Sequence, residues 1–409
     1  MMRLNHFAQD FSLSAAIAGF VTVLVGFTSA GVIVFQAAQT VGATPLEIGS
    51  WLWALGWGMG LTSIGLSLRY KVPIITAWST PGAALLITSA TGVSMPEAIG
   101  AFLLCGGLIT LFGFTGWFEQ AMKRLPLSLA SGMLAGVLLQ FGLKVFTAMQ
   151  TQFWMVAPMF LAYLLIRQIL PRYAVIAALG IGMLMAGVQG NLAVQTVQLQ
   201  WATPIFTAPQ FSINTLVGVA LPLFLVTMAS QNVPGVATIR AFGYSVPTSP
   251  LIGWTGTATV LLAPFGAFAI NLAAITAAIS MGRESHENPD RRYIAGIAVG
   301  VCYILIGLLG GTVSALFSAL PSELVVAIAG LALLGTIGKS LNTALSIESE
   351  RESALITFLV TASGVTLMGV GSAFWGLIAG ILTMVVTRRE GERKKLEGLS
   401  KKGEGLSKK

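Results

Sequence analysis

Charged residues are scarce in this sequence. Only 9% of the 409 residues are Asp, Glu, Lys or Arg, and 55% are hydrophobic, whereas a soluble protein carries roughly 25% charged residues. A water-soluble fold is excluded, because it would lack the polar surface that keeps such a fold in solution. We expect a chain that lies almost wholly in a bilayer and contacts membrane lipid.

Cysteine and histidine are nearly absent. Cys105 and Cys302 each lie inside an apolar run, which predicts packing residues and no disulfide framework. His6 and His286 lie outside the apolar runs, so no metal or other cofactor is expected. No nucleophile and base lie at a common depth, so the sequence predicts no catalytic residue and no enzyme.

Long apolar runs fill the rest of the chain and predict an all-α polytopic fold of about fourteen membrane segments. The first run is too long for a cleavable signal and lacks a clear cleavage site. The predicted segments are 13–35, 48–68, 74–91, 96–116, 127–143, 153–170, 173–190, 213–231, 251–263, 264–281, 293–317, 323–338, 353–368 and 370–387.

The distribution of Lys and Arg supports this count. With the N-terminus inside, 13 basic residues fall in inside loops and only Lys144 falls in an outside loop, as expected when cytoplasmic loops collect positive charge. The other 9 of the 23 lie in the tail 388–409, so both termini are predicted to be cytoplasmic. The tail repeats the pieces GEGLSKK and GLSKK, so part of it could be an addition to the natural chain. It predicts a solvated basic tail and no nucleic-acid partner.

Two segments are interrupted by Pro and Gly at matching positions of the two halves. Residues 77–91 read AWSTPGAALLITSAT and residues 263–278 read APFGAFAINLAAITAA, each after an extended lead-in, Val72 to Thr76 and Thr259 to Leu262. The breaks fall in the third and tenth segments, which predicts two inverted seven-segment repeats. Paired interrupted segments indicate a transporter site, although two Pro kinks relieved by neighbouring helices would give the same pattern.

Helices that begin at the breaks would offer free N–H groups and a partial positive charge to an anion. Ser79 and Thr80 fit N-cap positions, and Gly82 and Gly266 would allow a ligand to approach the backbone. Phe265 or Phe268 could lie against an aromatic ring or simply pack in the helix.

Further polar residues lie at membrane depth. Ser230, Gln231 and Asn232 close the eighth run, and Gln231 and Asn232 could bind substrate or satisfy the bundle interior. Asn271, one turn into the tenth segment, favours the substrate role. In the first segment, the hydroxyl groups of Thr28 and Ser29 could serve a substrate or could simply bond the preceding turn of their own helix.

Carboxylates are missing from the middle of every run, since all 15 Asp and Glu lie in loops, in the tail or at segment ends. Proton relays usually need such a group at membrane depth. A coupled proton would therefore travel on the substrate or through Glu47 or Glu323.

The stretch from Gly19 to Ala30, the Ser-Thr-Pro-Gly-Ala-Ala break and the Pro-Phe-Gly-Ala-Phe-Ala-Ile-Asn break resemble the bacterial benzoate transporter family, from about Phe11 to Thr387. More distantly, the arrangement resembles the superfamily of nucleobase permeases and sulfate-type anion transporters. Ser230 and Ile270 stand where nucleobase permeases carry glutamates, which argues against nucleobases. Ser29 matches a polar first-segment contact, and Ser79 to Gly82 and Phe265 to Phe268 match the two half-helix starts.

This resemblance implies a core domain of residues 1–126 and 213–318 that moves against a gate domain of residues 127–190 and 319–387. It also implies benzoate/proton symport in the bacterial inner membrane, by an elevator or rocking mechanism, and dimerisation through the gate domain. A transporter of another anion or of an uncharged aromatic such as a nucleobase, and an anion channel, remain open alternatives.

Overall fold

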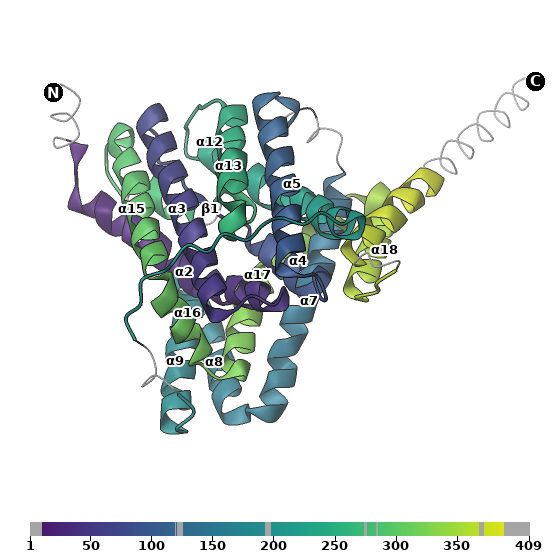
Figure 1. The fold of residues 1–409 in the computed structure, drawn as a ribbon, viewed down its shortest axis with the longest axis horizontal. Coiled ribbons are helices and arrows are strands. Elements are labelled where there is room, and N and C mark those ends of the chain that lie inside the picture. Colours follow the sequence, from purple (N-terminus) through teal and green to yellow (C-terminus); the bar gives the residue numbers. More distant parts are fainter. Residues whose placement is uncertain are drawn as a thin grey trace, which may run out of the picture.

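The computed structural model describes residues 10–118, 120, 126–192, 198–273, 276–283, 285–367 and 372–387, without the side chains of Thr28, Ser29, Arg172 and Ala241. The chain is mostly helical (Figure 1). The predicted basic tail, 388–409, lies outside the described residues.

The first half holds one short strand among its helices. The elements are α2 Leu13–Thr40, α3 Pro45–Tyr70, β1 Thr76–Trp78, α4 Thr80–Ser89, α5 Met95–Phe114, α7 Leu127–Thr151, α8 Phe153–Ile169 and α9 Ala174–Val188.

The second half holds the other described strand. Its elements are α10 Ile213–Thr215, η3 Leu216–Ala220, α11 Leu221–Thr227, η4 Met228–Asn232, α12 Val233–Ala241, α13 Thr248–Leu262, η5 Ala263–Phe265, β2 Ile270–Leu272, α14 Ala277–Met281, α15 Tyr293–Leu308, α16 Gly310–Ser318, α17 Ser322–Leu345, α18 Arg351–Ala362 and the helix Ser372–Thr387.

Local signals in the sequence account for several helix starts. Thr44 and Ser94 form capping boxes with Glu47 and Glu97, and a proline follows each cap at the first or second helical position. These starts lie close to the predicted segment boundaries, because the capping residues are the same ones that interrupt the apolar runs.

The predicted eighth segment was too short. The chain stays helical past Gln231 to Ala241, through two π-helical segments, η3 and η4. Pro222 and Pro234 follow these two segments at the second position. A proline lacks an N–H and clashes with the carbonyl four residues earlier, and the wider π turn accommodates both defects. The polar cluster therefore lies within a helix instead of at its end.

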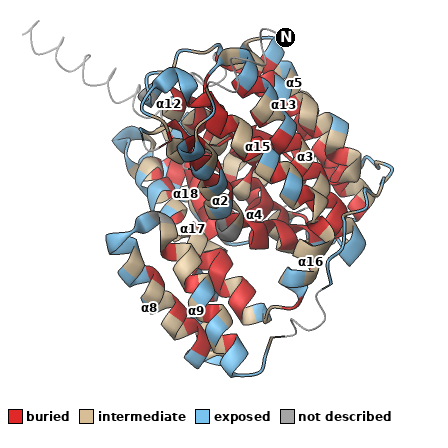
Figure 2. Ribbon diagram, turned by 90° about the vertical axis from the view of Figure 1, so that its left-hand side faces the viewer, coloured by how far each residue is buried: buried red, intermediate tan, exposed pale blue. Residues whose placement is uncertain are grey.

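The helices pack in two sets. In the first set, α3 packs on α15 and α13 packs on α5, and α2 packs against α15 and α4. In the second set, α7 packs on α17 and α18, and α8 packs on α9. Figure 2 shows the buried residues concentrated in α3, α4 and α15, whereas α8 and α9 carry many exposed positions.

The α3–α15 contact depends on glycine. A Cβ at Gly56 would stand 2.6 Å from the Cα of Gly307, and a Cβ at Gly300 would stand 2.6 Å from the carbonyl oxygen of Gly60. Real Cβ atoms do not approach other atoms so closely. The two backbones are therefore in direct contact, as small residues allow in membrane helix pairs.

The molecule has the polarity of a membrane protein. Large apolar side chains such as Leu165, Ile169 and Leu184 are exposed, whereas hydroxyl groups such as those of Ser63 and Thr227 are buried. Five described helices are long and apolar enough to cross a membrane, or six if α2 counts as one bent span. The count of fourteen segments and their inverted repeat stay predictions.

We expect Gly56→Leu to prevent assembly of the fold, because the added side chain would meet the α15 backbone. Fluorescence-detected size-exclusion chromatography in mild detergent should show little monodisperse protein. Gly65→Leu, on the same helix, is the matched control, since nothing lies within 4 Å of a Cβ there. Equal yields of the two variants would contradict this account of the α3–α15 contact.

Candidate functional site

The two interrupted segments meet at a short β-ribbon. Strands β1 and β2 pair antiparallel, with Thr76 opposite Leu272, Ala77 opposite Asn271 and Trp78 opposite Ile270. Backbone groups that leave a helix inside a membrane protein need partners, because no lipid group can supply them. The ribbon provides these partners to both segments at once, near the middle of the molecule (Figure 1).

The first break has the predicted form. Ser79 is the N-cap of α4, its Oγ accepts a hydrogen bond from the N–H of Gly82 at 3.0 Å, and Pro81 occupies the second helical position. Ser79 is also tied to the second half of the chain. Its N–H donates to the carbonyl of Ala269 at 3.2 Å, and the hydroxyl of Thr227 donates to its Oγ at 2.9 Å.

Few donors remain free at the start of α4. Pro81 has no N–H, and the N–H of Gly82 bonds the Ser79 hydroxyl. Among the described residues, no hydrogen bond occupies the N–H or the hydroxyl of Thr80, which is half-buried. Thr80 therefore presents the two open donors of this first turn, where the helix dipole also favours negative charge.

The second break differs from the prediction. Residues Thr259 to Leu262 belong to α13 and are not an extended lead-in. Pro264 and Phe265 lie in the 3-10 turn η5, which ends at Gly266 with φ 103°. The extended stretch comes later, at β2, so Asn271 lies in a strand and not in a helix. The helix of this half is α14, which starts at Ala277, beyond residues 274 and 275 that lie outside the description.

Gly266 and Phe268 consequently pack in an aromatic cluster. A Cβ at Gly266 would fall on the indole ring of Trp51. The fully buried Phe268 ring lies 5.8 Å from the rings of both Trp51 and Phe102. The prediction that these two residues mark a half-helix start is wrong, because the Pro-Gly pair ends α13 and reverses the chain. Gly82 is equally close-packed, with Leu223 Cδ1 2.6 Å from its Cβ position.

Asn271 is completely buried within the ribbon. Its Nδ2 donates to the carbonyl of Ala269 at 2.9 Å, and Ala269 itself has φ 39°. Its Oδ1 has no hydrogen-bond partner among the described residues. A buried amide oxygen without a partner is costly. This oxygen is therefore a candidate acceptor for a substrate proton.

Asn232 has a structural role that the sequence left open. Its Oδ1 accepts from the N–H of Leu272 at 3.0 Å, which fastens η4 to β2, and its Nδ2 lies 3.2 Å from the sulfur of Met228. Sequence reasoning missed Thr227 and Thr259. The Thr259 hydroxyl accepts from the N–H of Ile270 at 2.9 Å. Their only signal was a hydroxyl within an apolar run, which many helices also contain.

The other predicted site residues lie on helical segments that pack against the ribbon or against α4. Ser230 and Gln231 are half-buried in η4, which packs against β2 and α7. Ser29 lies in α2, which packs against α4 and α14, but its side chain lies outside the description. The structure thus gathers Ser79, Thr80, Gly82 and Asn271 at the ribbon, with η4 beside them.

The ribbon is free of formal charge. Arg292 is the one buried charged residue of the described chain, and it lies at the far end of α14. Its guanidinium donates to the carbonyls of Met281 at 2.9 Å and His286 at 2.7 Å, which completes the C-terminal end of that helix. The described residues contain no group of three or more His, Cys, Asp or Glu that could hold a metal ion.

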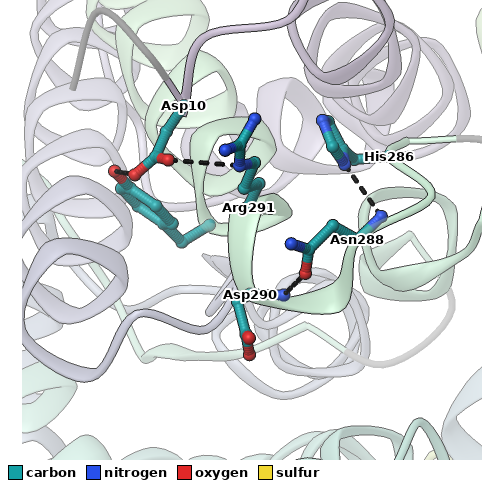
Figure 3. Close-up of polar contacts among 6 residues, drawn as sticks. Asp10, His286, Asn288, Asp290 and Arg291 are labelled. Carbon is teal, nitrogen blue, oxygen red and sulfur yellow. Dashed lines mark hydrogen bonds and ion pairs between the residues drawn. The ribbon is translucent and has the colours of Figure 1, made fainter. Parts of the chain in front are cut away.

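Charged residues gather in the loop that follows α14. Figure 3 shows Asp10 paired with Arg291 at 3.3 Å, and Asp10 also accepts from the hydroxyl of Tyr293 at 2.8 Å. His286 Nδ1 accepts from the N–H of Asn288 at 2.9 Å, and Asn288 in turn caps Asp290. The contacts of Asp10 tie the start of the described chain to this loop and to the start of α15.

Comparison with known proteins decides the family. The profile of benzoate membrane transport proteins matches residues 9–386. The chain belongs to this family. The inner membrane protein YdcO of Escherichia coli is 48% identical over 93% of this chain and 97% of its own length. A benzoate membrane transport protein of Acinetobacter baylyi is 42% identical over 94% of this chain and 97% of its own length.

Solved structures share the fold. The transmembrane domain of the cyanobacterial bicarbonate transporter BicA gives a TM-score of 0.58 at 13% identity, over 90% of this chain and 97% of that domain. SLC26A9 gives 0.57 at 13% identity, over 91% of this chain, which spans 65% of its length. Membership of this family makes the chain a membrane transport protein and not an enzyme.

We expect Asn232→Ala to destabilise the protein, because the buried N–H of Leu272 would lose its acceptor. An unsatisfied buried group costs about 1–3 kcal/mol, so thermal unfolding in detergent should start at a lower temperature. Asn288→Ala is the control, since this amide side chain is exposed and serves only a surface turn. An unchanged unfolding temperature for Asn232→Ala would show that β2 does not depend on this contact.

Proposed function

We propose that this protein is a secondary transporter that moves an aromatic carboxylate, benzoate first of all, into the cell together with a proton. The observation that carries the substrate is the 42% identity, over nearly the full length of both chains, to a protein named for benzoate transport. The uncharged ribbon supports an anion whose charge is balanced by a helix start and not by a basic side chain.

The substrate would lie at the start of α4. Its carboxylate would accept hydrogen bonds from the N–H and hydroxyl of Thr80, the two open donors there. Phe27 and Trp78 pack edge to face beside this point, with ring centroids 5.1 Å apart, and would contact the aromatic ring. The predicted contributions of Ser29, Ser230 and Gln231 remain part of this proposal.

The proton would travel on the substrate. Glu47 and Glu323, the alternatives at segment ends, both lie in the first turn of their helices, and on α3 Glu47 precedes the ribbon contact Ser63 by sixteen residues, about 24 Å along the helix. Glu47 Oε2 accepts from the N–H and hydroxyl of Thr44, each at 2.7 Å, and Glu323 Oε2 accepts from Ser322 at 3.0 Å. Asn271 Oδ1, a buried acceptor, could receive a proton shared with the bound acid.

The two sets of packed helices support a core that moves against a gate. The first set falls within residues 1–126 and 213–318, and the second set falls within 127–190 and 319–387. An elevator or rocking motion would displace the ribbon with the core. Fourteen segments in two inverted repeats, a kinship with nucleobase permeases, and dimerisation through the gate complete the proposal. Exposed apolar residues of α8 and α9 suit contact with lipid or a second copy.

The proposed location is the bacterial inner membrane with both termini in the cytoplasm. The name of the Escherichia coli relative and the excess of Lys and Arg in the predicted inside loops support it.

Uptake by proteoliposomes tests the function. We expect saturable uptake of labelled benzoate that an inwardly directed proton gradient accelerates and that a membrane potential leaves unchanged, since one proton and one carboxylate carry no net charge. Protein-free liposomes are the control, because neutral benzoic acid crosses lipid unaided. No saturable uptake would reject benzoate, and a benzoate current without proton movement would favour an anion channel.

A hydroxyl deletion at Thr80 tests the site. Thr80→Val keeps the shape of the side chain and removes one donor to the carboxylate, so the KM for benzoate should rise about tenfold, as expected for about 1.5 kcal/mol. Thr88→Val is the control on the same helix, because that hydroxyl bonds only carbonyls of its own α4. Equal KM values for the two variants would place the carboxylate elsewhere.

A further inference from the structure

A second polar site lies away from the ribbon. A cavity of about 310 Å³ opens between the C-terminal ends of α2 and α4 on one side and α7 and α17 on the other. Its wall includes Gln36, Gln39, Ile87, Phe141, Lys144 and Val326. Its volume is at the lower end of the range of small-molecule pockets, roughly 300–1,000 Å³. We call it the entry cavity.

The side chains of the entry cavity suit an amphipathic anion. Lys144 is exposed, and no carboxylate of the described chain lies within ion-pairing distance of it. No described hydrogen bond occupies the side-chain amides of Gln36 and Gln39, which can each donate two. Ile87 and Phe141 add an apolar surface next to these polar groups. A carboxylate attached to a ring matches this combination.

Lys144 is also exceptional in the charge pattern. It is the one basic residue among the predicted outside loops, against 13 in the inside loops. The acids at two other helix starts of this end already accept local hydrogen bonds, Glu47 from Thr44 in a capping box and Glu323 from the hydroxyl of Ser322. Among the described residues on this side, Lys144 is therefore the one cation without an ion-pair partner that an approaching anion would meet.

The entry cavity and the start of α4 are joined by one helix, since Ile87 in the cavity wall belongs to α4. Ile87 follows Thr80 by seven residues, which is about 10 Å along the helix axis. The cavity also lies between the two sets of packed helices, where the proposed motion would open a passage. Its α2 and α4 wall belongs to the first set, and its α7 and α17 wall belongs to the second.

We propose that the entry cavity binds the incoming aromatic carboxylate before it reaches the ribbon, with Lys144 holding the carboxylate and Gln36 and Gln39 assisting it. This inference rests on the proposed function and adds a second substrate site to it. The phosphate of a lipid headgroup shares the chemistry that Lys144 recognises, so the test must separate these two anions.

Substitution of Lys144 gives the first measurement. In proteoliposomes, Lys144→Gln should raise the KM for benzoate about three- to tenfold with little change in maximal rate, whereas Lys144→Arg should keep the wild-type KM. Lys339→Gln is the matched control, because this exposed lysine lies on α17 thirteen residues beyond Val326, about 20 Å along the helix. It should behave as wild type.

Restoration of the charge gives the second measurement. Lys144→Cys should have the raised KM, a cationic trimethylammonioethyl thiol reagent added outside should lower it again, and an anionic sulfonatoethyl reagent should raise it further. Benzoate should slow both modifications. The wild-type protein treated alike is the control for Cys105, which is buried, and Cys302, which is half-buried.

The outcomes separate the two proposals. A wild-type protein without saturable benzoate uptake overturns the proposed function and the entry site that rests on it. Wild-type uptake with an unchanged KM for Lys144→Gln overturns the entry site alone. Modification of Lys144→Cys that anionic lipid slows and benzoate does not would assign Lys144 to a lipid headgroup, and would equally overturn it.

Discussion

The pairing of β1 with β2 is the constraint on which the rest of this structure depends. Two chain segments leave helical hydrogen bonding inside a membrane protein, where no lipid group can supply partners for their backbone groups. They satisfy each other, and the pairing joins residues from the two halves of the sequence. Several other polar contacts near the ribbon bond backbone groups that this pairing leaves unmet.

Those completing contacts come from side chains on several helices. Thr259, Asn232 and Thr227 each bond a group of the ribbon or of the Ser79 cap. In addition, the Ser63 hydroxyl accepts from the N–H of Thr76 at 3.0 Å, and Ser67 bonds both the N–H and the carbonyl of Ile74. This explains why a chain with so few charges keeps many hydroxyl groups in its interior. The ribbon can be uncharged because neutral donors and acceptors suffice to hold it.

The sequence predicted the first break well and the second one poorly, for a physical reason. Around Ser79, one residue follows the strand, caps the next helix and lies two residues before a proline, so the signals coincide. In the second half they separate. Pro264 and Gly266 end α13, whereas the strand and the next helix follow several residues later in a stretch of small apolar residues that has no local signal. The role of Asn232 depends on a partner 40 residues away, which periodicity cannot reveal.

Mean hydropathy alone does not identify every buried helix. The 26-residue α3 is among the most buried helices, yet it is not one of the five that qualify as spans by length and hydropathy, because Gly, Trp and Ser lower its mean hydropathy. The proposed substrate and the proposed core and gate domains rest on the resemblance to benzoate transporters, since no residue pattern in this chain specifies either.

The glycine contact between α3 and α15 has a consequence for biogenesis. A ribosome completes α3 early and α15 only after most of the chain has been made, so the glycine face of α3 enters the membrane without its partner. Lipid cannot fill a groove shaped to accept another backbone. The first half therefore cannot complete its packing by itself, and the fold is completed only after the second half has been inserted.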